Sequence, residues 1–303
     1  MSSSAPKIAN DLPVVLTIGG SDPSGGAGIQ ADLKTMHQLG VYGASAITLL
    51  TVQNTRGVSR VFFLPEDLIR EQINAVCEDL DPDVIKVGAL GNAATVRAVA
   101  AAIADLPPRK SPLLVVVDPV MISKHGHALL DQAAIEALQN LILPKATIVT
   151  PNRHEAERLS GEAITTTEDA LTAARNILSM GPRYVVLKMR LQQAAVDLLV
   201  SADSEHEFST PYIEAAGNHG SGCVLSAAIA AGLAMRGRSH LTEHQTGAVV
   251  GVGEDSSLPS MEQMIEIVAG AKQFVTRGLK SGVRIGRGIH PVDILSAEKF
   301  GEF

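Results

Sequence analysis

The sequence predicts an α/β fold in three layers, with a mostly parallel central sheet and helices on both faces. Apolar runs of strand length alternate with amphipathic segments of helix length as far as about residue 190. Parallel strands need crossover connections, and helices that supply them cover both faces of the sheet. The chain has 303 residues, of which 46 % are hydrophobic, which is enough for one large core. We predict a loose tail at residues 1–12 and a single domain at 13–303.

The first elements set the pattern that the rest of the chain repeats. The run PVVLTI at 13–18 is typical of a buried strand, and the segment 28–40 places Ile29, Leu33 and Met36 on one helical face before Gly40 ends the helix. Further strands are expected at 44–50, 83–87, 113–117, 146–150 and 184–188. Helices are expected to begin at Pro65, after Asn92, near Asp131 and at a Thr165–Glu168 capping box, the last ending at Met180.

The alternation changes in the last third of the chain. Segments 195–200 and 206–213 have strand character without a helix between them, which predicts an antiparallel hairpin at an edge of the sheet. The apolar run that follows Gly222 predicts a helix that ends at Gly237, and EIVAGAKQFV predicts another near the C-terminus. The polar, glycine-containing segment 251–260 is the best candidate for a flexible surface loop.

Composition narrows the range of partners. The net charge of −7 and the absence of a basic cluster argue against a nucleic-acid partner. No run of about 18 apolar residues is present, so we expect no membrane-spanning helix. The chain has only two cysteines, and its N-terminus lacks the apolar stretch of a signal peptide, so we expect a cytoplasmic protein without disulfide bonds.

Ligands of open α/β sheets bind beyond the carboxyl ends of the strands, so polar residues at these positions are the site candidates. They are Gly19, Gly20, Ser21, Asp22, Gln53, Asn54, Lys86 to Gly88, Asp118, Asn152, Glu155, Lys188 and the turn Gly220 to Cys223. Carboxylates, amides, lysine and bare backbone together suit a phosphate and a divalent cation.

Two glycine-rich patterns near the N-terminus were compared with known phosphate motifs. GAGIQA at 26–31 fits a dinucleotide fingerprint, but the acidic residue expected about 20 residues later is missing. GSDPSGG at 20–26 has the glycine spacing of a Walker loop without its Lys-Ser/Thr pair. A dehydrogenase and a P-loop enzyme are therefore disfavoured, and tight turning remains the alternative explanation for these glycines.

The segment GNHGSGCV at 217–224 carries the clearest chemistry. Gly220 and Gly222 leave backbone amides unobstructed at the beginning of an apolar helix, where the helix dipole favours an anion. The same field is expected to lower the pKa of the Cys223 thiol. A proton acceptor beside a phosphate cradle is what phosphoryl transfer to an alcohol needs. The alternative is that Cys223 is only a small buried hydrophobic residue.

The stretch TIGGSDPSGGAGIQADLKTMHQLGVYGASAITLLTVQNTRGV closely resembles the N-terminal segment of bacterial hydroxymethylpyrimidine/phosphomethylpyrimidine kinases, members of the ribokinase-like superfamily. VVVDPVMISKHGHALL, TPNRHEAERLSG, NHGSGCVLSAAIAAGLA and GRGIHPV resemble later motifs of that family, in the same order. The resemblance implies a ribokinase-like fold, ATP and Mg²⁺, and a homodimer. It also implies phosphorylation of 4-amino-5-hydroxymethyl-2-methylpyrimidine and then of its monophosphate in thiamine biosynthesis.

The resemblance also implies roles for individual residues. Cys223 would be the general base, and the backbone amides of Gly220, Ser221 and Gly222 would bind the transferred phosphoryl group together with Lys188. Gln53 would hydrogen-bond the pyrimidine, in a pocket shared with Gly20, Asp22, Ala27, Asp32 and Val120. Asn152, Lys188 and Arg190 would contact the nucleotide, and Asp118 and Glu155 would organise magnesium. Simpler interpretations are a first-turn helix charge for Asp32, a turn residue for Asn152 and a strand-end cap for Asp118.

Three departures from the family pattern leave alternatives open. Met189, Arg190 and Leu191 stand where Gly-Gly-His is usual, and Arg190 is expected to point the same way as Lys188 and add a second cation. Ala89 replaces a frequent methionine, which predicts a roomier ring pocket, and the chain carries an insertion at 238–262. A pyridoxine or pyridoxal kinase and a catalytically weak pyrimidine-binding regulatory protein are the alternatives.

Overall fold

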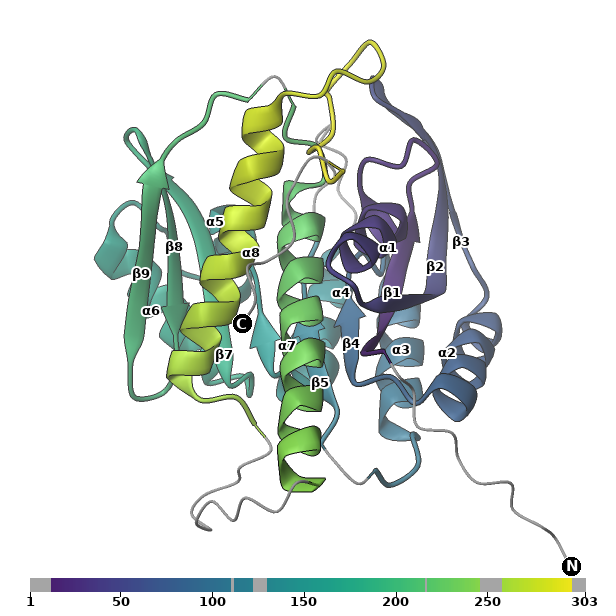
Figure 1. The fold of residues 1–303 in the computed structure, drawn as a ribbon. Coiled ribbons are helices and arrows are strands. Elements are labelled where there is room, and N and C mark those ends of the chain that lie inside the picture. Colours follow the sequence, from purple (N-terminus) through teal and green to yellow (C-terminus); the bar gives the residue numbers. More distant parts are fainter. Residues whose placement is uncertain (1–11, 110–111, 122–129, 216, 246–257, 296–303) are drawn as a thin grey trace, which may run out of the picture.

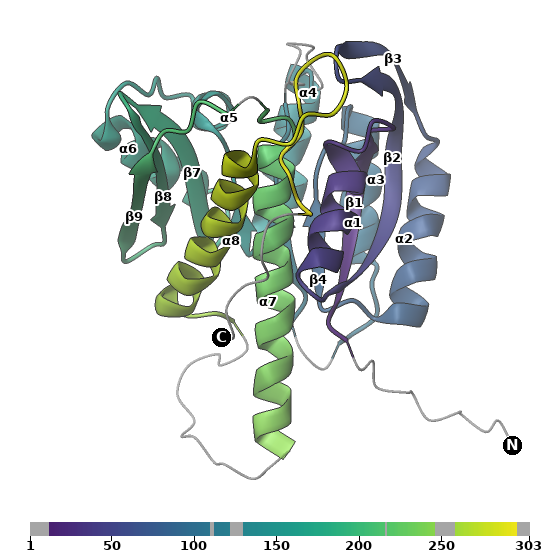
Figure 2. The same ribbon diagram turned by 45° about the horizontal axis from the view of Figure 1, so that its top comes forward.

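The computed structural model describes residues 12–109, 112–121, 130–215, 217–245 and 258–295. Its centre is a nine-stranded sheet of order β3-β2-β1-β4-β5-β6-β7-β8-β9, with helices on both faces (Figures 1 and 2). The predicted three-layer α/β class is thus confirmed. The strands are β1 Val14–Ser21, β2 Tyr42–Asn54, β3 Gly57–Phe63, β4 Val84–Val87, β5 Leu114–Val117, β6 Ile148–Val149, β7 Tyr184–Leu191, β8 Ala194–Val200 and β9 Glu205–Pro211.

The helices divide into two groups, each with its own hydrophobic cluster against the sheet. The α-helices are α1 Gly28–Gln38, α2 Glu66–Leu80, α3 Ala93–Ala104, α4 Gln132–Ala137, α5 Arg153–Ser160, α6 Thr167–Leu178, α7 Ser221–Gln245 and α8 Met261–Ser281. Met36 of α1, Ile229 of α7 and Phe274 of α8 belong to one cluster. Helices α2 to α6 contribute to the other cluster, on the opposite face. In the described ranges no helix is both long and apolar enough to cross a bilayer.

The sheet is parallel in its middle and antiparallel at both edges. Strands β1, β2, β4, β5, β6 and β7 pair in parallel, so their carboxyl ends lie at one edge. The predicted hairpin is confirmed as β8 and β9, which extend the sheet antiparallel to β7. The opposite antiparallel edge, β3 on β2, was not predicted. The sequence of β3 mixes polar and apolar residues that are all at least partly exposed, so it lacks the apolar run of the buried strands.

Two helix ends differ from the prediction. The capping box of α6 consists of Thr166 and Asp169, not Thr165 and Glu168, because the Thr166 hydroxyl accepts from the Asp169 amide. Helix α7 continues beyond Gly237 to Gln245. A glycine ends a helix when it takes a left-handed conformation, and Gly237 does not. The predicted surface loop and much of the predicted insertion fall on residues 246–257, outside the described residues, as does the tail up to residue 11.

The core under α2 offers a test of this packing. Ile73 is fully buried, whereas Leu68 on the same helix is 42 % exposed. We expect Ile73→Ala to lower the free energy of unfolding by about 2–5 kcal/mol, because it leaves a cavity in a close-packed cluster. Leu68→Ala should change it by only about 0.5 kcal/mol. Urea denaturation of both variants measures the difference, and equal losses would contradict the arrangement.

Candidate active site

A cavity of about 1190 Å³ opens at the edge of the sheet where the parallel strands end. Its walls come from the loop after β1, the ends of β2, β4, β5 and β7, the first turn of α7, and α8. The residues to which the resemblance gives roles line this cavity: Gly20, Asp22, Ala27, Asp32, Gln53, Asp118, Val120, Asn152, Glu155, Lys188, Arg190, Gly220, Ser221, Gly222 and Cys223. Two of the wider carboxyl-edge candidates, Asn54 and Val87, are not among its lining residues. The topology thus brings the candidates together at one place.

The turn before α7 is held in a conformation that only glycine adopts easily. Gly220 has φ +79°, and a Cβ there would overlap the backbone carbonyl of Gly26. Gly222 is less restricted, since a Cβ there would make ordinary contacts, 3.7 Å from Asp118 Oδ2 and 3.8 Å from Lys188 Nζ. The amide of Ser221 donates to the carbonyl of Asn218. The amides of Gly222 and Cys223 have no acceptor within the helix, so these two are available to an anion.

The loop after β1 is closed by Asp22, which is buried. Its carboxylate accepts from the amides of Ser24 and Ala27, each at 2.9 Å, and Oδ2 lies 3.0 Å from Nε2 of His219. Although burial alone would raise it, hydrogen bonds from His219 and Ser24 hold the pKa of Asp22 below its usual value. The glycines of this loop therefore serve mainly to let the chain turn tightly, and the Asp22 carboxylate stabilises the loop by accepting hydrogen bonds from its amides.

The sequence analysis gave no role to His219, which the structure places between two predicted site residues. Its Nε2 lies 3.0 Å from Asp22 Oδ2 and 3.3 Å from Gln53 Nε2. The backbone of His219 also bonds the C-terminal segment, through His290 and Val292. In the sequence, a role for His219 could have been inferred only from its position next to Gly220, in the segment GNHGSGCV.

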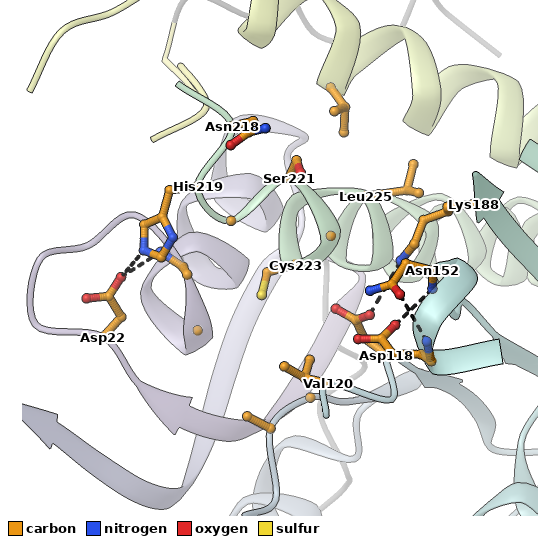
Figure 3. Close-up of a pocket in the computed structure, with 18 of the residues that line it drawn as sticks. Asp22, Asp118, Val120, Asn152, Lys188, Asn218, His219, Ser221, Cys223 and Leu225 are labelled. Carbon is orange, nitrogen blue, oxygen red and sulfur yellow. Dashed lines mark hydrogen bonds and ion pairs between the residues drawn. The ribbon is translucent and has the colours of Figure 1, made fainter. Parts of the chain in front are cut away.

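Cys223 lies in the first turn of α7, between two groups of polar side chains (Figure 3). On one side is the Asp22–His219 pair, and on the other are Asp118, Asn152 and Lys188. The prediction of a lowered thiol pKa is wrong for this structure: burial raises the pKa of Cys223 to about 12. Lys86 and the amide of Gly28 act in the opposite direction, whereas Asp32 and Asp118 add to the rise.

The second group combines two buried carboxylates with a lysine. Asp118 and Glu155 are 3 % and 6 % exposed. Lys188 Nζ lies 3.6 Å from Asp118 Oδ1 and donates to the carbonyl of Thr150. Burial raises the pKa of Glu155 to about 7, and the Asp118 carboxylate adds to this while Lys188 opposes it. Two carboxylates that repel each other in a buried place are stabilised by a cation.

This donor set fits magnesium. Within the described residues no three His, Cys, Asp or Glu side chains form a metal cluster. Mg²⁺, however, commonly takes one or two carboxylates and completes its shell with waters and substrate phosphates. Asn152 also contributes indirectly, because it forms a capping box with Glu155 and fixes that side chain at the start of α5.

Lys188 and Arg190 share the cavity but differ in surroundings. Lys188 of β7 is held by a backbone bridge to Asn152, which lies between β6 and α5. Arg190 points to the more exposed end, where its Cζ lies 3.9 Å above the Tyr212 ring and its Nε donates to the carbonyl of Gln192. The guanidinium is therefore engaged by Tyr212 and does not lie beside the Lys188 ammonium.

An anion-binding turn, a thiol, a lysine and paired carboxylates at the carboxyl edge of an α/β sheet define a phosphotransferase-type site. The sequence matches the family described as "Phosphomethylpyrimidine kinase" over residues 22–241. The chain belongs to this family.

Individual relatives agree with this assignment. The chain is 39 % identical over 284 residues to the hydroxymethylpyrimidine/phosphomethylpyrimidine kinase of Streptomyces coelicolor, covering 93 % of this chain and 94 % of that protein. It is 40 % identical over 287 residues to the thiamine biosynthesis bifunctional protein ThiED of Geobacter sulfurreducens, covering 94 % of this chain and 53 % of that longer protein. The solved structure of the pyridoxal kinase of Staphylococcus aureus in complex with ADP is also similar, with a TM-score of 0.77, 32 % identity and 95 % coverage of both chains.

The close contact between the two glycine-containing segments can be tested directly. Gly220→Ala should destabilise the protein by about 1–3 kcal/mol, because alanine resists a positive φ. It should also lower phosphoryl transfer by about 100-fold, because the turn must withdraw from Gly26 and moves its amides. Gly237→Ala, in the same helix but with nothing within 4 Å of the added Cβ, is the matched control. Urea denaturation and steady-state kinetics check both, and normal kinetics in Gly220→Ala would contradict this geometry.

Proposed function

We propose that this protein is an ATP-dependent kinase that phosphorylates 4-amino-5-hydroxymethyl-2-methylpyrimidine and its monophosphate in thiamine biosynthesis. The observation that carries the proposal is the position of Cys223, at the anion-binding turn and within one cavity with the Asp118, Glu155 and Lys188 group. Family membership and the names of the relatives support the same substrates.

The reaction follows from this arrangement. The substrate hydroxyl gives its proton to the Cys223 sulfur as its oxygen forms a bond to the γ-phosphorus, while the bond from that phosphorus to ADP breaks. The first-turn amides of α7 and the Lys188 ammonium stabilise the charge on the transferred group. Asp118 and Glu155 would hold Mg²⁺, which when bound neutralises phosphate charge.

The ring would occupy the part of the cavity beside Gln53. Gln53 offers an amide to the polar edge of the ring, and Gly20, Ala27, Ala89 and Val120 line the same cavity with little side-chain bulk. Asp32 lies deeper, with its Oδ2 already bonded by Thr17. The small Ala89 is the observation that favours a second candidate, a pyridoxal kinase, since it leaves room for a bulkier ring, and the similar Staphylococcus aureus structure is a pyridoxal kinase.

A coupled assay of ADP release with the pyrimidine alcohol, its monophosphate and pyridoxal tests the proposal. We expect turnover with the first two to exceed that with pyridoxal. Cys223→Ala should keep the fold and ATP binding but lose about 100-fold or more in kcat, because the general base is gone. Cys223→Ser should recover little, since a hydroxyl is a poor base. Activity of Cys223→Ala within a few-fold of wild type would remove the thiol from the mechanism, and higher turnover with pyridoxal would favour the second candidate.

The two cations of β7 should differ in their effects. Lys188→Ala should lower kcat by about 100-fold, because the lysine lies beside the carboxylates where the transferred group is placed. Arg190→Ala should raise the KM for ATP only a few-fold, because its guanidinium lies on Tyr212 at the exposed end of the cavity. Steady-state kinetics with varied ATP separate the two. A larger kcat loss in Arg190→Ala than in Lys188→Ala would contradict these assignments.

Two further proposals concern the state of the protein. A cytoplasmic location would keep the Cys223 thiol reduced, as the proposed chemistry requires, and both cysteines are free. A homodimer would cover the exposed apolar side chains that gather on β2 and the edge strand β3, namely Leu50, Val52, Phe62 and Phe63.

A further inference from the structure

Two buried lysines in this protein each pair with a buried aspartate, yet their surroundings differ. Lys272 of α8 donates to Asp197 Oδ2 at 2.8 Å and to the carbonyls of Ala195 and Phe208, both at 3.1 Å. These three acceptors match the three N–H groups of an ammonium. Lys272 therefore serves to fasten α8 to the β8–β9 hairpin.

Lys86 of β4 is the more deeply buried of the two, at 1 % exposure, but it is not saturated. Within the described residues its ammonium has one hydrogen-bond acceptor, Asp32 Oδ2, at 2.9 Å. Its other two N–H groups have no acceptor among the described residues, which is costly for a buried ammonium unless a further negative or polar group comes near through the cavity that Lys86 lines. An incompletely paired ammonium points to such a group.

The position of Lys86 shows where that group is. Lys86, Asp32 and Cys223 line the same cavity, and Lys86 interacts electrostatically with the Cys223 sulfur. The space around the ammonium is kept open by Gly88, where a Cβ would lie 2.9 Å from Lys86 Nζ. Asp32 is fixed in turn, since Thr17 donates to its Oδ2 at 2.6 Å. Strands β1 and β4 and helix α1 thus hold one positive charge near the first turn of α7.

We propose that Lys86 is a positioning residue whose ammonium stabilises negative charge on the Cys223 sulfur, and that Asp32 and Thr17 hold this ammonium in place. The inference rests on the proposed function only for the use of that sulfur as a base. It deepens the function by naming the positive charge that favours the thiolate form of this base.

The other groups around Cys223 make this charge necessary. Asp32 from α1 and Asp118 after β5 both raise the pKa of the thiol, in addition to the effect of burial. Lys86 and the Gly28 amide are the groups that lower it. Asp32 therefore has two opposite effects: it repels a thiolate directly, but it holds the lysine that stabilises one. Removing Asp32 alone must consequently lower the pKa of the thiol, and removing Lys86 in addition must raise it again.

Alkylation of Cys223 by iodoacetamide measures this without any kinase turnover. The thiol releases its proton to solvent, the thiolate forms an S–C bond, and iodide leaves, so the rate follows the thiolate fraction. We would use a Cys77→Ala background, so that Cys223 is the one cysteine. Asp32→Asn should raise the alkylation rate at pH 7.5 by about tenfold, and the double variant Asp32→Asn/Lys86→Met should be about tenfold slower than Asp32→Asn, one pKa unit each.

The controls separate an electrostatic effect from a structural one. The double variant Asp197→Asn/Lys272→Met removes the other buried lysine–aspartate pair, and it should leave the pH dependence of alkylation unchanged. Equal alkylation rates in Asp32→Asn and in the Lys86 double variant, with both folded by near-ultraviolet circular dichroism, would overturn the inference. If the double variant does not fold, Asp32→Asn decides alone, since a slower or unchanged rate there also overturns it.

The outcome is distinguishable from failure of the proposed function. The expected order of alkylation rates in a protein without turnover on any ring alcohol would support the role of Lys86 and refute the kinase proposal. Normal kinase turnover together with alkylation rates that do not change when Lys86 is replaced would support the kinase proposal and refute the role of Lys86. In the active enzyme, the acid side of the pH profile of kcat/KM follows deprotonation of the base, so it should lie about one pH unit higher in the Lys86 double variant than in Asp32→Asn, while the KM for ATP stays unchanged.

Discussion

The hydrogen bond between Asp22 and His219 joins segments 197 residues apart, and the site depends on it. It fixes the glycine loop after β1 against the turn that begins α7, where Gly220 packs on the backbone of Gly26. The C-terminal segment closes the other side, because His219 exchanges backbone hydrogen bonds with His290 and Val292. The N-terminus of α7, with its orphan amides and positive dipole end, is thus aimed by contacts from both ends of the chain.

Two charged groups of the cavity lie near Cys223, one with its charges balanced and one with an excess of negative charge. On the ring side, Lys86 and Asp32 neutralise each other while leaving part of the ammonium unpaired. In the second group, Lys188 is the cation that the described residues place beside Asp118, and burial raises the pKa of Glu155 to about 7. This group therefore needs one more positive charge to keep both carboxylates ionised, which a divalent cation would supply. The Lys86–Asp32 pair is neutral, whereas the group of Asp118, Glu155 and Lys188 has an excess of negative charge. A cation would therefore bind at the second group.

Much of the fold and the cavity could be predicted from the sequence, because both follow from short-range patterns. Apolar runs of strand length predicted the parallel strands, and the carboxyl-edge rule collected residues such as Asp118 and Cys223 into one cavity. The edge strand β3 escaped because an exposed strand has no apolar run. The roles of His219 and Lys86 escaped for another reason. Their significance lies in partners far away in the chain, and a lysine inside VIKV carries no local sign that Asp32 lies 2.9 Å away. The thiol pKa was wrong because burial depends on the whole fold.

Met189, Arg190 and Leu191, which replace the family's Gly-Gly-His, are accommodated as regular strand residues of the sheet. These residues continue β7 to Leu191 and pair with β8 up to Ala194, and Met189 is buried in the core. Side chains alternate along a strand, so burying Met189 turns Arg190 outward, where Tyr212 receives its guanidinium. Lys188, one residue earlier on the same side as Arg190, keeps its place beside Asp118. The substitution therefore changes the exposed end of the cavity and leaves Lys188 beside Asp118.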